Sequence, residues 1–395
     1  MTIPQAARPE LDRLRTWSLA IGVGASLLFL VAAVGNRVHF FHAYLMAYLF
    51  WLGIALGCVA LLMLHHLVSG RWGFVIQRLL ESGGRTLPLL AVLFVPLLFG
   101  LRDLFLWARP EAVAAQAILQ HRQPYLNGPF FSTRALVYFA VWITLASLLS
   151  KWSLEQDRTG SPDLTRKIRH LSGPGLVLYG LTMTFAAFDW VMTLGPQWHS
   201  TIFGAVFMVG QALAALCFVV LMSWRLADRG PLAGVMSTKQ VHDLGNLMLA
   251  FVMLWAYMAF SQYLIIWSGN LPDEIPWYLS RMAGNWMWVA MFLIAFHFAV
   301  PFLILLSRAT KRHLRLLVPV AAGILVMRLV DLFFIVTPAL HPGEVSVHWT
   351  DVLAPMAIGG IWFWAFLGYL RSQPLLPLHD PRFVPAPEPA HGAVS

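Results

Sequence analysis

The chain has 395 residues, of which 59% are hydrophobic and only 11% are charged, and its mean hydropathy is +0.69. Soluble domains carry about 25% charged and roughly 45–50% apolar residues, so this composition excludes a soluble globular protein. The formal net charge of +9 does not indicate nucleic-acid binding, because the Lys and Arg residues gather in short loops between apolar segments. The composition predicts a polytopic α-helical membrane protein that lies in a lipid bilayer.

Ten apolar segments are each long enough to cross a hydrocarbon core of about 30 Å as a helix. The first is too long for the apolar region of a signal peptide, so it is predicted to be a span. Residues 1–15 are predicted to form a cytoplasmic segment, and the Pro-rich residues 372–395 a mobile tail. The predicted transmembrane domain, 16–371, has spans at about 16–35, 40–68, 86–108, 132–152, 173–194, 201–226, 242–267, 284–307, 315–338 and 351–371.

The Lys and Arg residues outside the spans predict the orientation of the chain. The N-terminal segment, the loops after the even-numbered spans and the tail hold most of them. The opposite loops hold only Arg37, Arg109, Arg122 and Arg281. Because cytoplasmic loops carry the excess of Lys and Arg, both termini are predicted to be cytoplasmic.

The segment between the second and third predicted spans, residues 71–85 (RWGFVIQRLLESGGR), is amphipathic as a helix. Its large apolar residues fall on one helical face, and Arg71, Gln77, Arg78 and Glu81 fall on the other. Such a helix is predicted to lie flat at the inner membrane interface.

An internal repeat is visible at the ends of two spans. The fifth and the ninth spans both place a Pro seven residues after an Asp and a His three residues further on: Asp189, Pro196 and His199, then Asp331, Pro338 and His341. Spans two to five (40–194) and six to nine (201–338) are therefore predicted to form two tandem four-helix bundles, with the first and tenth spans flanking them. An offset of four helices gives the two copies the same orientation in the membrane.

Ionisable side chains inside a span cost at least about 2.5–3.5 kcal/mol on insertion scales, so each is expected to face the bundle interior beside a partner. The spans contain few of them: Arg102 and Asp103 in the third, Asp189 in the fifth, His297 in the eighth, Arg328 and Asp331 in the ninth, with His242 and Asp243 at the start of the seventh. Arg328 and Asp331 are spaced i, i+3, which places them within ion-pair reach on one helix face.

Two interpretations of these residues stay open. The first is a pathway of groups that exchange protons, made of Asp103, Asp189, His242, Asp243, His297, Arg328 and Asp331. In the second, the arginine–aspartate pairs fix helix packing, and His242 and Asp243 cap the start of a helix.

The chain offers little to a metal or a haem. Cys58 and Cys217 both lie in apolar runs without a CxxC or CxxCH motif, which excludes thiolate-ligated clusters and covalent haem. Haem b needs two facing imidazoles at compatible depths, and the histidines of the second span have only His297 as a deep partner in another helix. The loops are also too short for a soluble catalytic domain. We predict no catalytic residue, no metal ligand and no bound cofactor in this chain, with quinone left open as a ligand.

With these motifs assembled, the chain resembles the NrfD/polysulfide-reductase superfamily of membrane subunits. More closely, it resembles the ActF-type subunit of alternative complex III, the bacterial quinol:cytochrome c oxidoreductase. The resemblance covers about residues 35–371 and is carried by the segments FAAFDWVMTL (185–194), WHSTIFG (198–204), HDLGN (242–246), WAYMAFSQYLIIW (255–267), FHF (296–298), RLVD (328–331) and WTD (349–351).

The resemblance implies a subunit of a respiratory or photosynthetic complex in the bacterial cytoplasmic (inner) membrane. Its partners would be other membrane subunits, iron–sulfur subunits and cytochrome c subunits, which carry the iron–sulfur clusters and haem c. In that family the quinol site is usually assigned to a companion subunit, and this type of subunit is proposed to contribute a proton route. Asp189, His297, Arg328 and Asp331 fall at the motif positions, whereas Asn246 stands where some relatives carry Lys.

Three alternatives to this function stay open. The chain could itself bind quinol in an outer pocket near His199 or His341, and it would then be the quinone-binding rather than a non-catalytic subunit. It could be an independent transporter or channel, since a parallel repeat with polar residues near mid-depth fits one. It could also be a structural scaffold, if the arginine–aspartate pairs only fix packing.

Overall fold

The computed structural model describes residues 8–195, 197–227, 236–341, 343–377 and 380. Within these ranges all regular structure is helical, and ten helices are long and apolar enough to cross a membrane. The prediction of an all-α, multi-pass integral membrane protein is confirmed. Residues 1–7, Pro196 of the repeat and most of the predicted tail lie outside the described residues.

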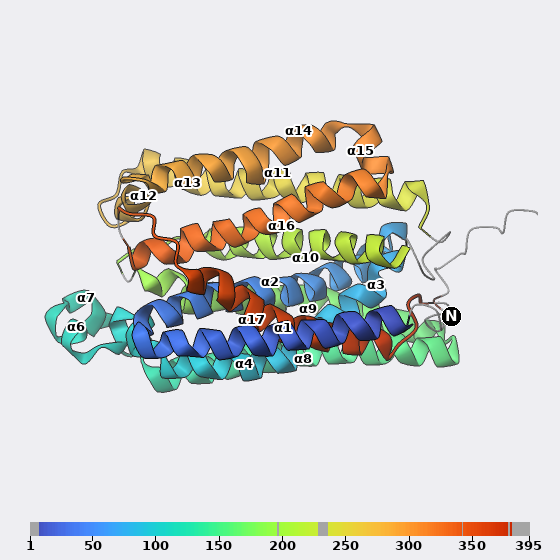
Figure 1. Ribbon diagram of the computed structural model, residues 1–395, viewed down its shortest axis with the longest axis horizontal. Helices are drawn as coiled ribbons and strands as arrows, with labels where there is room; N and C mark the ends of the chain where they lie inside the picture. The colour runs from blue at the N-terminus through green and yellow to red at the C-terminus, as the bar shows by residue number, and fades with distance from the viewer. Residues whose placement is uncertain (1–7, 196, 228–235, 342, 378–379, 381–395) are drawn as a thin grey trace, which may run out of the picture.

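The long helices run side by side along the length of the molecule (Figure 1). Eight spans are single helices: α1 (Arg8–Gly35), α2 (Arg37–Val68), α8 (Gly128–Thr159), α9 (Pro162–Trp190), α10 (Phe203–Ala227), α11 (Thr238–Gly269), α16 (Leu314–Val336) and α17 (Trp349–Arg371). The third span consists of α3 (Arg71–Gly84) and α4 (Leu87–Phe99). The eighth consists of α13 (Trp286–Leu293), the π-helix η4 (Ile294–Ala299) and α14 (Val300–Leu306).

Short helices connect the spans at the two ends of the molecule. We call the end where α1 begins the terminal end, and the opposite end, which carries α6, α7 and α12, the distal end (Figure 1). The short helices are α5 (Leu101–Leu104), η2 (Leu106–Ala108), α6 (Pro110–Ala115), α7 (Ala117–Arg122), η3 (Met192–Leu194), α12 (Ile275–Met282), α15 (Arg308–Arg312) and η5 (Thr337–Ala339).

Helices α2 and α10 form the centre of the molecule, since 94% and 83% of their most apolar stretches are buried. They cross closely at Gly57, where an added Cβ would lie 2.2 Å from the backbone oxygen of Gln211. Small residues allow this kind of backbone approach between membrane helices. The two central helices belong to different copies of the predicted repeat, so this crossing joins the two groups of helices.

We expect Gly57→Val to destabilise the protein by about 1–3 kcal/mol, because the new side chain overlaps the α10 backbone and cannot rotate away. The matched control is Gly180→Val, since an added Cβ at Gly180 meets nothing within 4 Å. Thermal unfolding in detergent measures both variants. Equal midpoints for the two would contradict the close crossing.

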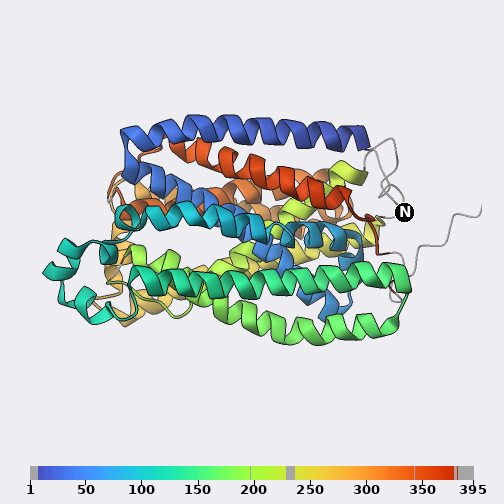
Figure 2. The same cartoon turned by 90° about the horizontal axis from the view of Figure 1, so that it is seen from below.

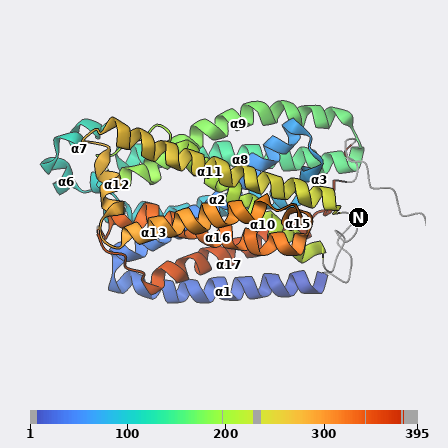
Figure 3. The same cartoon turned by 90° about the horizontal axis from the view of Figure 1, so that it is seen from above.

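The two flanking spans, α1 and α17, lie together at one edge of the molecule, with α9 at the opposite edge (Figures 2 and 3). Gly22 and Gly360 face each other where they cross, and an added Cβ on Gly22 would lie 2.7 Å from the backbone nitrogen of Ile361. The guanidinium of Arg15 lies 4.9 Å from the ring centroid of Trp364. The first and tenth spans therefore form one pair of helices beside the others.

The predictions for the third span are wrong in two respects. The span runs over Arg71–Phe99 rather than 86–108, and α3, predicted to lie flat on the membrane surface, is packed inside the bundle. Every residue from Trp72 to Gly84 is buried, because α2 covers the apolar face while α8 and the chain after α17 supply polar partners to the other face. Arg102 and Asp103 consequently lie beyond the span, in α5 at the distal end.

Candidate functional site

Asp189 lies at the end of α9, with 1% of its side chain exposed, and its cation comes from another helix. Arg134 of α8 donates from Nε to Oδ2 at 2.8 Å and from Nη2 to Oδ1 at 3.0 Å. The hydroxyl of Tyr138, one turn further along α8, donates to Oδ2 at 2.8 Å. The bidentate contact from Arg134 and the hydrogen bond from the Tyr138 hydroxyl together stabilise the buried carboxylate of Asp189.

Sequence reasoning missed Arg134, although it is the only arginine in the fourth predicted span. The spacing of four residues to Tyr138 placed both on one face of α8, but nothing in the sequence indicated which helix this face meets. Arg134 is also fixed from outside the span, where Nη1 donates to the Tyr125 carbonyl at 2.8 Å. Its guanidinium lies 3.8 Å from the Tyr125 ring. Burial, followed by the negative charge of Asp189, raises the pKa of Tyr125 to about 12, so this phenol stays protonated.

The ion pair between Arg328 and Asp331, expected from their i, i+3 spacing, is present and buried in α16. Gly210 of α10 makes room for it, because an added Cβ would lie 2.5 Å from the guanidinium carbon. The Phe207 ring lies 5.2 Å from that carbon. The second repeated Asp is therefore paired within its own helix, whereas the first, Asp189, is paired across helices.

His297 lies in η4, the one π-helical turn among the described residues. Its side chain is fully buried, and neither ring nitrogen has a hydrogen-bond partner among the described residues. The ring packs edge-on against Trp255 of α11 at 4.2 Å, and the charge of Arg328 acts on it. π-helical turns within α-helices are frequent at functional sites. Together, His297, Trp255, Arg328 and Asp331 form what we call the second-bundle cluster.

Asp103 does not pair with Arg102 inside a span, as the sequence had suggested. It lies at the distal end, where Arg37 donates from Nε to its Oδ2 at 2.8 Å. Arg109 donates to the backbone oxygens of Arg102 and Asp103 at 2.6 and 3.0 Å. Since Arg37 is 60% exposed, this pair is a surface contact that ties α2 to α5.

His242 and Asp243 lie near the terminal end and are not the helix cap. Ser237 caps α11 and forms a capping box with Gln240, so His242 falls in the second turn. Its Nδ1 lies 3.2 Å from the side-chain nitrogen of Asn246. No hydrogen bond or ion pair among the described residues joins this group to Asp189 or Asp331, so the structure does not bring the seven predicted pathway residues into one cluster.

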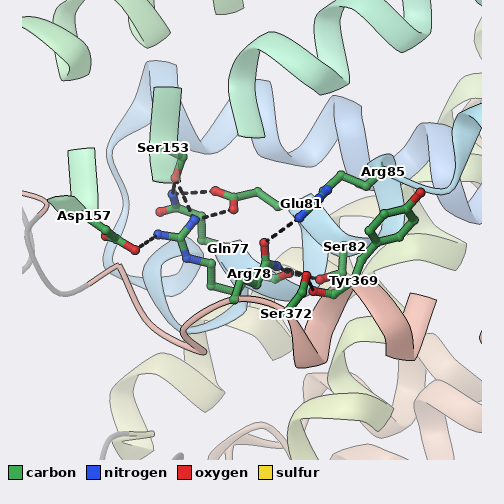
Figure 4. Close-up of polar contacts among 10 residues, drawn as sticks. Gln77, Arg78, Glu81, Ser82, Arg85, Ser153, Asp157, Tyr369 and Ser372 are labelled. Atoms are coloured by element: carbon green, nitrogen blue, oxygen red, sulfur yellow. Dashed lines mark hydrogen bonds and ion pairs between the residues drawn. The ribbon is translucent and has the colours of Figure 1, made fainter. Parts of the chain in front are cut away.

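A second buried charge network, missed from the sequence, surrounds Arg78 at the terminal end (Figure 4). Arg78 and Glu81 are both fully buried, with 2.5 Å between Nη1 and Oε2. Arg78 also donates to Ser153 of α8 at 3.0 Å and pairs with Asp157, while Gln77 donates to Glu81 at 2.9 Å. The i, i+3 spacing of Arg78 and Glu81 was the signal for this pair.

The first residues of the predicted mobile tail are packed against the same network. Gln373 donates to the backbone oxygen of Arg78 at 3.1 Å and to the Ser82 hydroxyl at 2.8 Å, and Arg85 donates to Gln373 at 3.3 Å. The Arg85 guanidinium also stacks over the ring of Tyr369, 4.6 Å from its centroid. The chain after α17 thus fastens α3 in its buried position.

We expect Arg78→Met to destabilise the protein by about 3–5 kcal/mol, because it leaves Glu81 as a buried carboxylate without its cation. Arg166→Met is the matched control, since the pair of Arg166 with Asp163 is 72% exposed on both sides; it should change the unfolding free energy by at most about 1 kcal/mol. Denaturant unfolding in detergent compares the two. If Arg78→Met lowered the unfolding free energy no more than Arg166→Met does, the network around Arg78 would be solvated.

The distal end holds a cavity of about 230 Å³. It is lined by the segments that follow both repeated aspartates, around Trp198 and Pro338, and by α12. Trp198 stacks on Trp277 at 4.7 Å, and its buried indole N–H has no partner among the described residues. Arg281 lies over Trp277 at 3.7 Å and donates to backbone oxygens of α16, and burial lowers its pKa to about 9.

The two histidines predicted to lie near a quinone do not line this cavity. The side chain of His199 is 53% exposed, with its Nε2 3.7 Å from Oε1 of Glu274. His341 instead faces His39 of α2. Across the described ranges, no group of three or more His, Cys, Asp or Glu side chains is arranged to hold a metal ion.

Comparison with known proteins finds no matching family model and no matching curated protein. The motifs and the geometry of the buried acids are therefore the observations that bear on function. What the structure establishes is a multi-pass, all-α membrane protein with a buried, arginine-paired carboxylate at both repeated aspartates.

Proposed function

We propose that the chain is a membrane subunit of a quinol-oxidising electron-transfer complex of the alternative complex III type, in which its buried acids take part in proton transfer. The observation that carries this proposal is the pair of repeated aspartates. Asp189 and Asp331 occupy corresponding places in the two copies, and both are buried and held by an arginine. Intramembrane carboxylates that face the interior of a bundle are typical of proton relays.

Each acid has neighbours that suit proton exchange. The carboxylate of Asp189 accepts a hydrogen bond from the Tyr138 hydroxyl at 2.8 Å, and a phenol can both donate and accept a proton along a chain of hydrogen bonds. In the second-bundle cluster, His297 has two ring nitrogens without partners among the described residues; its ring packs against Trp255, and the charge of Arg328 acts on it. A neutral imidazole offers one donor and one acceptor, which is the property a relay needs.

In this proposal the distal end faces the outer side of the bacterial cytoplasmic membrane and both termini face the cytoplasm. The excess of Lys and Arg at the terminal end supports that orientation. The redox centres, haem c and iron–sulfur clusters, belong to partner subunits, and this chain supplies protonatable side chains rather than electron carriers.

The experiment that tests this assignment is a purification from native membranes. The tagged chain is extracted in mild detergent, and mass spectrometry, the visible spectrum and quinol:cytochrome c activity are recorded on one fraction. Co-purification of c-type haem, iron–sulfur subunits and activity is the expected result. A colourless, solitary chain would contradict the proposal and make an independent transporter or channel the better hypothesis.

A second candidate function is quinol binding by this chain itself, favoured by the distal cavity. Its walls are mostly apolar, and the stacked rings of Trp198 and Trp277 form part of them, as suits a flat aromatic ligand. A photoreactive quinone analogue added to the purified complex should then label peptides around Trp198 and Trp277. Labelling confined to a companion subunit would exclude this function.

A further inference from the structure

Three imidazoles meet at the distal end, outside the clusters described above. They come from distant parts of the chain: His39 from the first turn of α2, His341 from the loop after η5, and His348 from the N-cap of α17. Nδ1 of His39 lies 3.5 Å from Nε2 of His341. The ring centroid of His39 lies 5.2 Å from that of His341 and 4.8 Å from that of His348. We call these three side chains the imidazole cluster.

The charged groups around the imidazole cluster are few. Asp351 is the nearest carboxylate, and it accepts a hydrogen bond from the backbone nitrogen of His348 at 2.9 Å. The cluster is bordered on the α2 side by His42, whose buried Nδ1 has no partner among the described residues. Asp103 and Arg109 act on His42 from the α5 side, and Arg37 is engaged with Asp103. The three imidazoles thus face one nearby carboxylate and a fourth imidazole.

We propose that His39, His341 and His348 form a proton-binding site that holds a single shared proton at the distal end. A hydrogen bond between two imidazole nitrogens requires an N–H on one and a lone pair on the other. When the His39 and His341 rings are both neutral, one proton lies between their facing nitrogens and a second lies on one of the two outer nitrogens. An added proton binds the remaining outer nitrogen, forms one imidazolium and strengthens the bond between the rings.

A second added proton is strongly disfavoured at this pair. It would place an N–H on both facing nitrogens, so the hydrogen bond would break and two cations would face each other at the observed ring separation of 5.2 Å. The ring centroid of His348 lies 4.8 Å from that of His39, so a positive charge on His39 also acts on His348. Asp351 is the carboxylate that offsets this charge. Interacting sites of this kind titrate as a unit rather than one residue at a time. The geometry therefore lets the cluster hold one added proton at a time.

The imidazole cluster contains the histidine of the second repeat. His341 lies ten residues after Asp331, where the chain that leaves the second-bundle cluster reaches the distal end. In the first repeat the corresponding His199 is exposed beside Glu274, so only the second repeat builds this site. The inference rests on the proposed function for the source of the proton, which would be quinol oxidation. Proton binding by the cluster does not depend on it.

The test is hydrogen–deuterium exchange at the Cε1 position of each histidine, followed by mass spectrometry of the full-length purified chain over a range of pH. We expect His39 and His341 to give coupled curves, with two protonation steps separated by more than about one pH unit. In His341→Gln the His39 curve should become a single step, and His348→Gln should shift that curve in the same sense. Both substituted side chains are half-buried at the distal end, and thermal unfolding confirms that the variants fold.

His199→Gln is the matched control, because it removes the corresponding histidine of the first repeat and should leave the His39 curve unchanged. The exposed His121 and His170 serve as internal references in every sample. Independent single-step curves for His39, His341 and His348 in the unmodified chain would overturn the proposal, as would a His39 curve that His341→Gln leaves unaltered. Because this measurement needs neither quinol nor partners, its failure is distinguishable from failure of the proposed function.

Discussion

Asp189→Asn should lower quinol:cytochrome c turnover of the purified complex by about 10²-fold, the order expected when a group that transfers protons is lost. The same change should also destabilise the chain by about 3–5 kcal/mol, because Arg134 is then left as a buried cation without its carboxylate. Turnover at saturating quinol and denaturant unfolding of the same preparation measure the two effects separately.

The double variant Arg134→Gln with Asp189→Asn distinguishes a proton role from a packing role. Removing both charges of a buried pair is often neutral for stability, so unfolding should return close to that of the unmodified chain. If Asp189 transfers protons, turnover stays low in the double variant. Recovery of turnover together with stability would mean that the pair only holds α8 against α9.

We expect His297→Phe to raise the stability of the chain while it lowers turnover, whereas Asp189→Asn lowers both. The ring is fully buried with no partner for either nitrogen among the described residues, and removing an unsatisfied buried polar group stabilises a protein by about 1–3 kcal/mol. If His297 relays protons beside Arg328 and Asp331, turnover falls by about 10²-fold while the unfolding temperature rises.

The matched control for His297 is Phe298, its neighbour in the same π-helical turn. Phe298→Leu alters packing next to His297 without touching a protonatable group, so it should leave turnover within about twofold while changing stability by at most about 1.5 kcal/mol. Unchanged turnover in His297→Phe would remove His297 from the proposed pathway.

The sequence predicted the spans well because the hydrophobic length needed to cross a bilayer is a local property. The structure gives ten candidate spans, as expected, and most predicted boundaries fall within those helices. The exception was the third span, where residues 71–85 carry the amphipathic pattern of a surface helix. The hydrophobic periodicity of this segment indicates that one helical face is polar, but it does not indicate whether water or other helices cover that face.

The site could be predicted only in part. The i, i+3 pair of Arg328 and Asp331 follows from helix geometry alone. The pairing of Asp189 with Arg134 joins residues 55 positions apart, and it depends on which faces of α8 and α9 meet. Likewise the contact between His39 and His341 spans 302 positions, so no local pattern could indicate it.

By itself the sequence determined the class of the protein, the number of spans and the intramembrane positions of Asp189, Arg328 and Asp331, because length, hydropathy and helical spacing act within one segment. Only the tertiary structure decided which charges pair, that α3 is buried, and that three histidines meet at the distal end. These outcomes depend on helix contacts across the bundle, which follow from the packing of whole surfaces and leave no periodic signal in any one helix.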